Sequence, residues 1–271
     1  MTSRAGPSLR VEGRYFAEGC RAVGGVDEVG RGAWAGPVSV GIAVVTPGCG
    51  RKLPRGVRDS KQLTHDEREA LFEPLGRACA SWAVGHASAG ECDDLGMTAA
   101  QRLAARRALE QLDLVPEVLL LDGRFDFLAD GAGGSSDFPP VRMIVRGDAS
   151  SKAIASASVL AKVTRDRLMA EVADHFPWYG FERNRGYPTP AHKMALAAWG
   201  CTTIHRTTWA FVDGLWYRPS GRPTLAHGGG RQPALFDLRG LDLSASEMLA
   251  AEPAADEELD AVLEQAGMGM V

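Results

Sequence analysis

Hydrophobic and polar positions along the chain follow two alternating periodicities. Short apolar runs rich in β-branched residues, bounded by Gly, Pro or Asp, predict buried strands. Longer stretches with apolar residues at helical spacing predict helices. The predicted strands cover residues 23–29, 35–46, 80–87, 118–121 and 141–145, and the predicted helices cover residues 64–79, 93–112 and 151–175.

Several boundaries of these elements have a local chemical cause. Thr64 and Glu67 have the spacing of a capping box, in which each side chain accepts a hydrogen bond from the other residue's backbone N–H. Pro116 marks the end of the helix predicted from Asp93, because proline has no N–H to donate. Pro37 lies near the start of the second strand, where a sheet tolerates proline.

The order of the elements predicts an α/β fold. Two strands that read as a hairpin, followed by strands that alternate with helices, indicate a mixed five-stranded sheet with helices on its faces. Pro and Gly residues after Tyr217 lead into an acidic, Ala-rich end. We therefore expect an N-terminal segment over 1–20, a domain with a C-terminal helical part over 21–218, and a mostly disordered tail over 219–271.

Composition narrows the class of protein. The chain has 271 residues, of which 45% are hydrophobic, so it can bury a full core. No apolar run approaches the roughly 20 residues of a membrane helix, and no signal-peptide pattern is present. The five scattered cysteines contain no Cys-x-x-Cys pair, which argues against a disulfide framework or a zinc cluster. We expect a cytoplasmic protein that does not contact membranes.

The net charge of −4 conceals an asymmetry. From Ser220 onward the chain has three basic and nine acidic residues, a balance of −6, which leaves +2 for the remainder. A net charge of +2 on residues 1–219 is compatible with a nucleic-acid-binding face but does not by itself identify one.

Acidic residues follow three of the predicted strands. Asp27 and Glu28 end the first strand, Asp122 ends the fourth, and Asp148 follows the fifth. Groups at strand ends of an α/β sheet can converge in one cleft, although acids at a strand end can also point into water. Four converging carboxylates would repel one another unless divalent cations neutralised them, and oxygen ligands without Cys or His favour Mg²⁺ or Mn²⁺. Such a site suits phosphodiester hydrolysis with two metal ions.

Several short motifs, in the same order, resemble those of bacterial ribonuclease HII, also called type 2 ribonuclease H. The similarity extends from about residue 20 to about residue 215. The motifs are Asp27-Glu28-Val29-Gly30-Arg31-Gly32, Asp59-Ser60-Lys61, Asp122-Gly123, Arg146-Gly147-Asp148, the run from Ala155 to Asp166, and Gly186-Tyr187-Pro188-Thr189.

This resemblance implies a ribonuclease H-like fold and a metal-dependent endoribonuclease. Enzymes of this family cut the RNA strand of RNA/DNA hybrids and incise duplex DNA 5′ of single embedded ribonucleotides, leaving 3′-OH and 5′-phosphate ends. By resemblance, the catalytic residues that bind two Mg²⁺ or Mn²⁺ ions are Asp27, Glu28, Asp122 and Asp148. The residues that would bind substrate are Gly30, Arg31 and Gly32 near the ribose 2′-OH, Lys61 near a phosphate, and Tyr187 against the sugar at the RNA–DNA junction.

Some of these residues also have plainer interpretations. Arg31 can pair with a neighbouring acid, and Tyr187 can be a turn aromatic. Asp166 reads as a surface ion pair and is the reserve metal ligand should Asp148 fail. Ser158 and Lys162 share one helix face, which either packing or a phosphate contact would explain.

Other candidate residues lie outside the motifs. His205 and Arg206 could contact the nucleic-acid backbone or form a solvated turn. Trp34, Trp82 and Trp199 are expected in the core rather than as stacking platforms.

The chain departs from the family pattern at two positions and in one loop. Arg124 follows Asp122-Gly123 where relatives commonly have Asn, and Gln62 follows Lys61 where a second Lys is usual. Residues 131–137, which include a flexible Gly-rich loop tip at 131–136, look inserted. None of these differences removes a predicted metal ligand.

Two other functional classes remain open from the sequence. Another metal-dependent nuclease of the same superfamily would share the acids but not the Gly-Arg-Gly and Gly-Tyr-Pro-Thr motifs. A non-catalytic hybrid-binding protein would have lost at least one ligand, and all four acids are present.

The tail contains a short motif that suggests a partner. Gln232, Leu235 and Phe236 resemble the peptide by which bacterial replication and repair proteins bind the sliding clamp, with the two apolar side chains filling a pocket. A chance match, or docking of this segment on the body of the same chain, would also explain it. We expect the protein to be a monomer otherwise.

Overall fold

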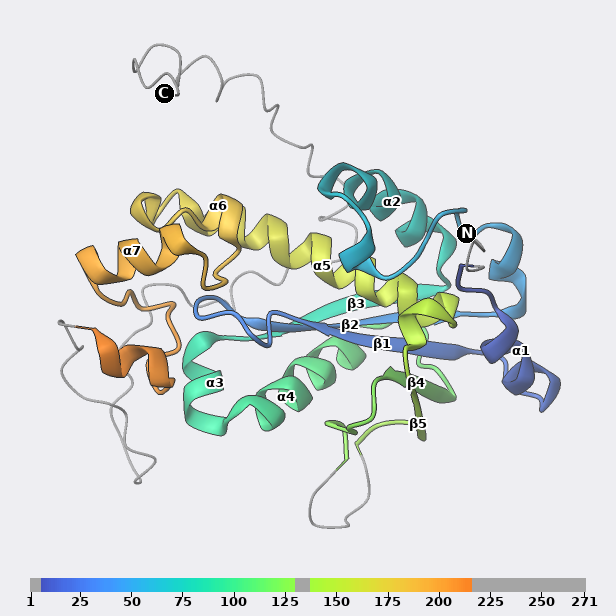
Figure 1. Cartoon of the computed structure of the whole chain (residues 1–271). Helices are drawn as coiled ribbons and strands as arrows, with labels where there is room; N and C mark the ends of the chain where they lie inside the picture. The colour runs from blue at the N-terminus through green and yellow to red at the C-terminus, as the bar shows by residue number, and fades with distance from the viewer. Residues whose placement is uncertain (1–5, 130–136, 216–271) are drawn as a thin grey trace.

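The computed structural model describes residues 6–129 and 137–215 (Figure 1). Within these residues, strands form one sheet in the order β3-β2-β1-β4-β5. The strands are β1 Val23–Val29, β2 Val38–Val45, β3 Ser81–Ala87, β4 Val118–Asp122 and β5 Val141–Ile144. β1 pairs antiparallel with β2, and β2 with β3, whereas β4 runs parallel to β1 and β5 runs parallel to β4. The predicted mixed five-stranded sheet is confirmed.

Helices cover both faces of the sheet. They are α1 Arg10–Ala17, α2 His65–Ala78, α3 Ala89–Leu95, α4 Met97–Glu110, α5 Lys152–Ala173, α6 Phe181–Asn184 and α7 Pro190–Trp199. The short 3₁₀ turns are η1 Pro47–Arg51, η2 Ser60–Gln62, η3 Gly147–Ala149, η4 Pro177–Tyr179 and η5 Ala210–Gly214. In Figure 1, α2 and α5 lie above the sheet and α3 and α4 lie below it.

One predicted helix differs from the structure. The pattern predicts a single helix from Asp93 to Leu112, but Gly96 adopts φ +79° and separates α3 from α4. A left-handed residue cannot continue a right-handed helix, and glycine takes this conformation without steric cost. Helix α1 lies within the segment 1–20, for which the sequence predicted no element.

Alternation along the strands sends successive side chains to opposite faces. Leu120 packs with the cluster between the sheet, α2 and α5, which contains Ile154 and Leu160. Leu121 packs with the cluster between the sheet and α4, which contains Ala104. Because β1 and β4 are covered on both faces, their apolar runs are nearly continuous.

Glycines in the strands allow the helices to approach closely. A Cβ on Gly25 of β1 would lie 2.1 Å from the backbone carbonyl carbon of Ala153, at the start of α5. A Cβ on Gly85 of β3 would lie 2.0 Å from the carbonyl oxygen of Ala104 in α4. Both separations are shorter than van der Waals contact, so α5 and α4 owe their positions on the sheet to these glycines.

Side-chain caps explain where two helices begin. The predicted capping box is confirmed: Thr64 Oγ1 accepts from Glu67 N–H at 3.2 Å, and Glu67 Oε2 accepts from Thr64 N–H at 2.8 Å. At the start of α5, the buried Glu12 accepts from the Ser151 hydroxyl at 2.6 Å and from the Ala153 N–H at 2.8 Å. This contact attaches α1 to α5.

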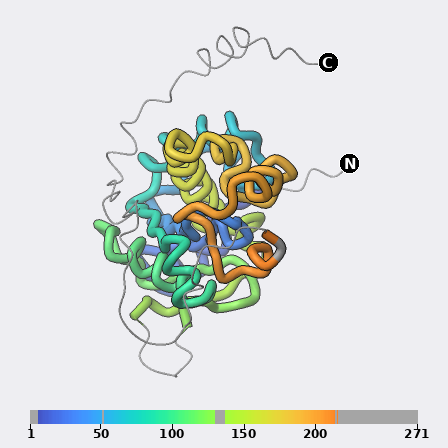
Figure 2. The backbone as a smooth tube through the Cα atoms, turned by 90° about the vertical axis from the view of Figure 1, so that its left-hand side faces the viewer, coloured from blue at the N-terminus to red at the C-terminus, as the bar shows by residue number. Residues whose placement is uncertain are grey.

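A third apolar cluster packs the C-terminal half of α5 against α6, α7 and the loop between β1 and β2. It includes Met169, Phe181 and Leu196, with Ala35 contributed by the loop. Figure 2 looks onto this part, where the yellow and orange segments lie nearest the viewer. The cluster thus connects the C-terminal helices to the segment that follows β1.

The tryptophans only partly match the prediction of a core role. Trp82 is buried with 6% of its surface exposed, and the half-buried Trp34 stacks on Phe211 at 4.2 Å between ring centroids. Trp199 is 59% exposed and stacks instead on Trp178 at the surface, so its predicted burial is wrong.

Parts of the sequence-based prediction fall outside the described residues. These are the loop tip at 131–136 and the tail at 219–271, including Gln232, Leu235 and Phe236. Among the residues that the structure describes, no helix combines the length and apolar character needed to cross a membrane.

Candidate active site

The parallel part of the sheet brings two of the predicted acids next to each other. β1 and β4 run in the same direction with Val26 opposite Leu121, so the next residues are Asp27 on β1 and Asp122 on β4. Asp27 Oδ1 accepts from the backbone N–H of Glu28 at 2.9 Å. Carboxylates therefore lie on both strands just beyond the last pair of the β1–β4 ladder.

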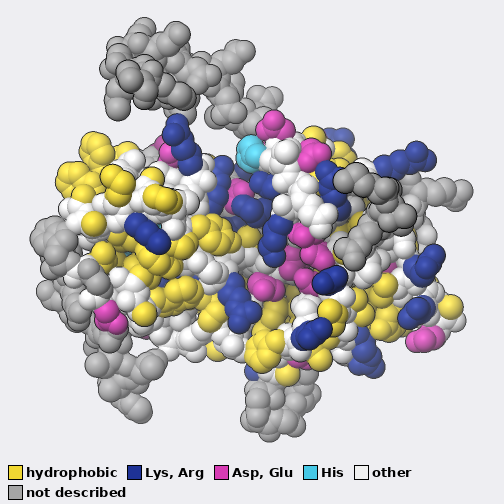
Figure 3. All heavy atoms as spheres, viewed as in Figure 1, with side chains coloured by type: hydrophobic (Ala, Val, Ile, Leu, Met, Phe, Trp, Pro, Cys, Tyr) yellow, Lys and Arg dark blue, Asp and Glu magenta, His cyan; other side chains and the backbone are white. Residues whose placement is uncertain are grey.

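A hydrogen bond brings Asp148 to the same edge. Asp122 pairs with Ile144 of β5, and its Oδ1 accepts from the Gly147 N–H at 2.7 Å. Gly147 begins the short turn η3, and Asp148 is the next residue. Figure 3 shows acidic side chains gathered near the middle of one face, with Lys and Arg side chains around them.

Burial and mutual repulsion raise the pKa of three acids at this edge. Burial, together with the charges of Glu28 and Asp122, raises the pKa of Asp27 to about 8, although Ser158 and Lys61 oppose the rise. Burial also raises the pKa of Glu28 and of Asp148, and the charge of Asp122 contributes to both. Each acid thus lies within electrostatic range of another.

Lys61 is held beside these acids. Asp59 caps the turn η2 by accepting from the Lys61 N–H at 2.9 Å, and the hydroxyls of Ser60 and Ser158 are 2.9 Å apart. Burial lowers the pKa of Lys61, but the nearby acids, Asp27 first among them, outweigh this effect and raise it above its ordinary value. Lys61 therefore stays positively charged at neutral pH.

The donor set suits a hard divalent cation. In the described part of the chain, no three His, Cys, Asp or Glu side chains stand close enough together to hold a metal ion as placed. The acids of this edge nevertheless supply only carboxylate oxygens. A divalent cation would neutralise the repulsion from Glu28 and Asp122, which adds to the effect of burial on the pKa of Asp27. The assignment of Asp27, Glu28, Asp122 and Asp148 as metal ligands stays a prediction.

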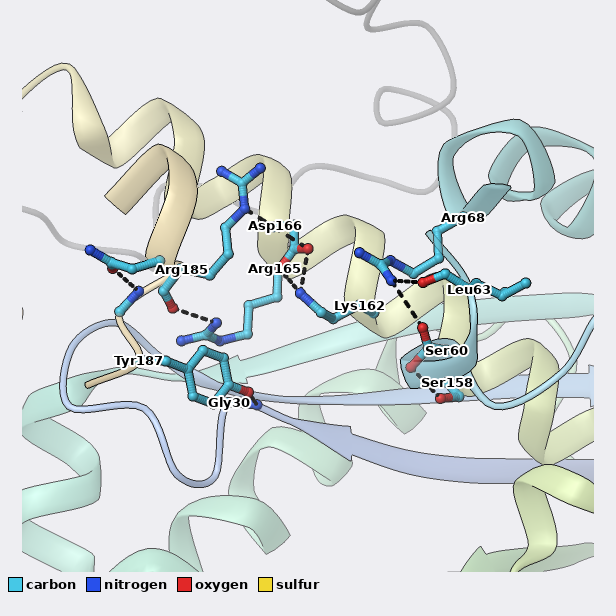
Figure 4. Close-up of polar contacts among 12 residues, drawn as sticks. Gly30, Ser60, Leu63, Arg68, Ser158, Lys162, Arg165, Asp166, Arg185 and Tyr187 are labelled. Atoms are coloured by element: carbon cyan, nitrogen blue, oxygen red, sulfur yellow. Dashed lines mark hydrogen bonds and ion pairs between the residues drawn. The ribbon is translucent and has the colours of Figure 1, made fainter. Parts of the chain in front are cut away.

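The loop after β1 contacts Tyr187. The Gly30 N–H donates to Tyr187 Oη at 3.2 Å, and Figure 4 shows the tyrosine ring beside Gly30. Gly30 has φ +84°, and a Cβ there would lie 2.3 Å from Arg165 Nε, so the position requires glycine.

Arg31 interacts electrostatically with Glu28. Its positive charge opposes the rise that burial causes in the pKa of Glu28, consistent with the alternative in which Arg31 interacts with a neighbouring acid.

Two buried arginines hold the backbone of this loop. Arg206 donates to the carbonyl oxygens of Gly30 and Arg31 at 2.7 and 2.8 Å and of Gly36 at 3.2 Å. Arg165 donates to those of Pro37 and Ala35 at 2.9 and 3.2 Å, and to that of Arg185 at 2.9 Å. The backbone geometry around Gly30 is thus fixed from the protein interior.

His205 and Arg206 are not on the surface, so their predicted contact with nucleic acid, or role in a solvated turn, is wrong. They are 2% and 0% exposed. His205 forms an isolated bridge with Ala35, and Arg206 binds the loop carbonyls from inside. Neither residue gives a sequence signal for burial, because the Gly36 carbonyl that Arg206 binds is 170 residues away and the ring of His205 contacts His192 of α7.

Asp166 forms the predicted ion pair, but not at the surface. Its carboxylate is 4% exposed, contacts Lys162 on the preceding turn of α5, and has Arg185 Nε at 3.9 Å. Figure 4 shows Lys162 and Asp166 between Tyr187 at one end and Ser60 with Ser158 at the other. Ser158 contacts Ser60, and Lys162 pairs with Asp166; a phosphate contact of either residue stays a prediction.

Comparison with known proteins identifies the family of the chain. The family model for ribonuclease HII matches residues 24–212. Ribonuclease HII of Streptomyces avermitilis is 49% identical over 197 residues, which cover 73% of this chain and 80% of that protein. The crystal structure of ribonuclease H2 from Pyrococcus horikoshii OT3 is similar, with a TM-score of 0.61 and 30% identity, over 71% of this chain and 95% of that chain.

Two more distant solved structures share the fold. Ribonuclease HIII in complex with Mn²⁺, named Bst-RNase HIII, is 18% identical with a TM-score of 0.55, over 71% of this chain and 68% of that chain. Ribonuclease HII of Archaeoglobus fulgidus, solved in complex with PCNA, is 23% identical with a TM-score of 0.56, over 69% of this chain and 94% of that chain. With its ribonuclease H-like sheet, the match over residues 24–212 and a relative at 49% identity, this chain belongs to the ribonuclease HII family, whose members are endoribonucleases that hydrolyse the RNA of RNA/DNA hybrids.

Proposed function

We propose that this endoribonuclease also incises duplex DNA on the 5′ side of a single embedded ribonucleotide, leaving a DNA 3′-OH and a 5′-phosphate on the ribonucleotide. One observation carries the proposal. β1 supplies Asp27 and Glu28 and continues directly into Gly30, whose N–H donates to Tyr187 Oη. The acids and the residues proposed to recognise the ribose are thus consecutive on one strand end.

In this proposal, Asp27, Glu28, Asp122 and Asp148 hold two Mg²⁺ or Mn²⁺ ions. When bound, these ions supply an activated water and charge stabilisation of the departing oxygen. The protonated Lys61 beside the acids contacts a phosphate of the cut strand. The metal dependence of the family and the Mn²⁺ complex of the ribonuclease HIII structure support this assignment.

Recognition of the ribonucleotide falls to the backbone of Gly30, Arg31 and Gly32 and to the ring of Tyr187. A Cβ on Gly32 would meet no heavy atom within 4 Å, which leaves its backbone open to a ligand. The 2′-OH distinguishes RNA from DNA, and backbone groups without a Cβ nearby can approach it. The ring of Tyr187 packs against the sugar at the RNA–DNA junction.

The tail supplies a proposed partner contact. We propose that Gln232, Leu235 and Phe236 bind the bacterial sliding clamp, which would raise the concentration of the enzyme near DNA. The Archaeoglobus fulgidus enzyme solved with PCNA supports such an association in this fold. We further propose that the protein is otherwise a cytoplasmic monomer.

The test is to map the products from a duplex DNA that carries one ribonucleotide, with Mg²⁺ or Mn²⁺ and with a chelator. We expect one cut, 5′ of the ribonucleotide, only when the metal is present. An all-DNA duplex of the same sequence is the control and should stay intact, which separates this activity from that of another nuclease of the superfamily. A cut on the 3′ side, or equal cutting of the all-DNA duplex, would overturn the proposal.

A further inference from the structure

Two buried histidines are connected to Tyr187 by hydrogen bonds and have no part in the proposed chemistry. His192 of α7 is 0% exposed and His205 is 2% exposed. Their Nε2 atoms are 3.0 Å apart. A buried pair of titratable rings in direct contact requires a structural or functional explanation.

The surrounding hydrogen bonds fix which nitrogen of each ring carries the proton. The Thr202 N–H donates to His205 Nδ1 at 2.9 Å, so this nitrogen is an acceptor and the proton of His205 is on Nε2. His205 Nε2–H then donates to His192 Nε2, which leaves the proton of His192 on Nδ1. His192 Nδ1–H donates to the carbonyl oxygen of Tyr187 at 2.9 Å.

This series of hydrogen bonds ends at the main chain of Tyr187, whose hydroxyl contacts Gly30 of the loop after β1. The Tyr187 carbonyl accepts from His192 and from the Thr189 N–H, the latter at 2.8 Å. The Tyr187 N–H donates to the Asn184 carbonyl, 2.8 Å away, and its hydroxyl accepts from Gly30. The rings of Tyr179 and Phe181 pack on His205, with centroids 5.1 and 5.7 Å away. The two histidines thus connect the third apolar cluster to the main chain of Tyr187 and restrict its movement.

We propose that His192 and His205 are positioning residues, which act through Tyr187 to set its ring against Gly30 and thereby determine the preference of the enzyme for an RNA–DNA junction. This inference rests on the proposed function, because it takes Tyr187 as the residue that reads the junction. It assigns the two rings a role beyond filling the core.

The kinetic test compares kcat/KM on a duplex with one ribonucleotide and on a continuous RNA/DNA hybrid, per folded molecule. His192→Leu removes the side-chain donor to the Tyr187 carbonyl and leaves only the Thr189 N–H there. It should lower the ratio of kcat/KM on the single-ribonucleotide duplex to kcat/KM on the hybrid about tenfold. His192→Asn places an amide N–H where Nδ1–H lies and should restore the ratio to within about twofold. In a Tyr187→Ala background, His192→Leu should leave the ratio unchanged, because its effect passes through the tyrosine.

A second variant covers the case in which His192→Leu does not fold. His205→Asn places an oxygen where Nδ1 accepts from Thr202 but lacks the donor to His192, so it should lower the same ratio in the same direction. Two results would show that the histidines only stabilise the fold and would overturn the proposal. One is an equal fall in kcat/KM on both substrates, and the other is a fall in the ratio that persists in the Tyr187→Ala background.

A measurement without substrate separates this proposal from the proposed function. The NMR shift of the Gly30 amide reports its hydrogen bond to Tyr187, and Tyr187→Phe identifies the shift that follows loss of that bond. His192→Leu and His205→Asn should move the Gly30 amide toward the Tyr187→Phe position. If they do and the wild-type enzyme does not cut at embedded ribonucleotides, the proposed function fails while the positioning role stands; if the amide does not move, the positioning role fails.

Discussion

Tyr187 is held at three points of its own backbone and side chain. Its carbonyl accepts from His192, its N–H donates to Asn184, and its hydroxyl accepts from Gly30. The guanidinium of Arg165 lies 5.6 Å from the centre of its ring. A side chain fixed in this way can orient a sugar without losing further freedom on binding.

For Tyr187→Ala we expect a loss of about 1–3 kcal/mol in transition-state stabilisation on a single-ribonucleotide duplex, the value of one stacking contact. The measurement is kcat/KM per folded molecule, with the melting temperature recorded alongside. A collapse in melting temperature with unchanged activity per folded molecule would make Tyr187 a purely structural residue.

Individual residues differed in how far the sequence could place them. Asp27 and Asp122 could be located because each directly follows an apolar run, and Asp148 because it comes soon after the fifth strand. Parallel strands bring such positions to one edge of the sheet. Arg206 and His192 could not, since their buried side chains are satisfied by the Gly30 carbonyl and by the ring of His205, which only the folded chain brings to them. Those partners depend on tertiary packing, which local sequence does not record.

At the level of elements, the distance between α5 and β1 depends on Gly25. A Cβ there would lie 2.1 Å from the backbone of Ala153, which a rotamer change cannot relieve. We expect Gly25→Ala to destabilise the protein by about 3 kcal/mol or more, at or above the upper end for overpacking. The measurement is the free energy of unfolding in urea.

Gly13→Ala is the matched control. Gly13 lies inside α1, and an added Cβ would meet no heavy atom within 4 Å. It should stabilise the protein by about 0.5–1 kcal/mol, the helix preference of Ala over Gly. Equal stabilities of the two variants would contradict the close packing of α5 on β1.

The histidine pair predicts a pH dependence of stability. Burial, with a contribution from His192, lowers the pKa of His205 from its ordinary value of 6.5 to about 3. Between these values the unfolded chain carries a proton that the folded protein does not, so this contribution to stability is lost as pH falls below 6.5. For His205 the slope is about 1.4 kcal/mol per pH unit.

Comparison of the wild type with His205→Asn isolates this slope. Burial raises the pKa of Glu12 and of Asp27, so these carboxyls make the folded state more stable as pH falls and oppose the histidine. The difference in free energy of unfolding between the two proteins, measured in urea at pH 7, 6 and 5, should shrink with falling pH. A difference that does not change with pH would show that His205 is not held neutral by the fold.

The sequence predicted whether an element is a helix or a strand better than it predicted the residues at which the element begins and ends. The strands and α5 were located within a few residues, because their apolar runs are long and bounded by Gly, Pro or Asp. The break at Gly96 was missed, since a single glycine inside an Ala-rich helical pattern is often tolerated. Helix α1 was missed because it owes its place to the contact of Glu12 with the start of α5.

For the whole molecule, the tail motif predicts an interaction that the catalytic body does not need. A peptide spanning residues 228–240 should bind the bacterial sliding clamp with a Kd of roughly micromolar strength. Leu235→Ala with Phe236→Ala should abolish this binding in a calorimetric titration and leave cleavage of short substrates unchanged. The absence of any heat of binding for the wild-type peptide at high micromolar concentration would show that the tail motif does not bind the clamp.

The central claim concerns the acids at the ends of β1, β4 and β5, and Asp122→Asn tests it most directly. Asparagine keeps the oxygen that accepts from the Gly147 N–H at 2.7 Å but removes the negative charge. The control is Asp94→Asn, which removes the charge of an exposed acid on α3. With Mg²⁺ or Mn²⁺ and a single-ribonucleotide duplex, we expect Asp122→Asn to lose several orders of magnitude in cleavage rate, while Asp94→Asn cuts like the wild type. Cleavage by Asp122→Asn at near the wild-type rate would contradict the claim.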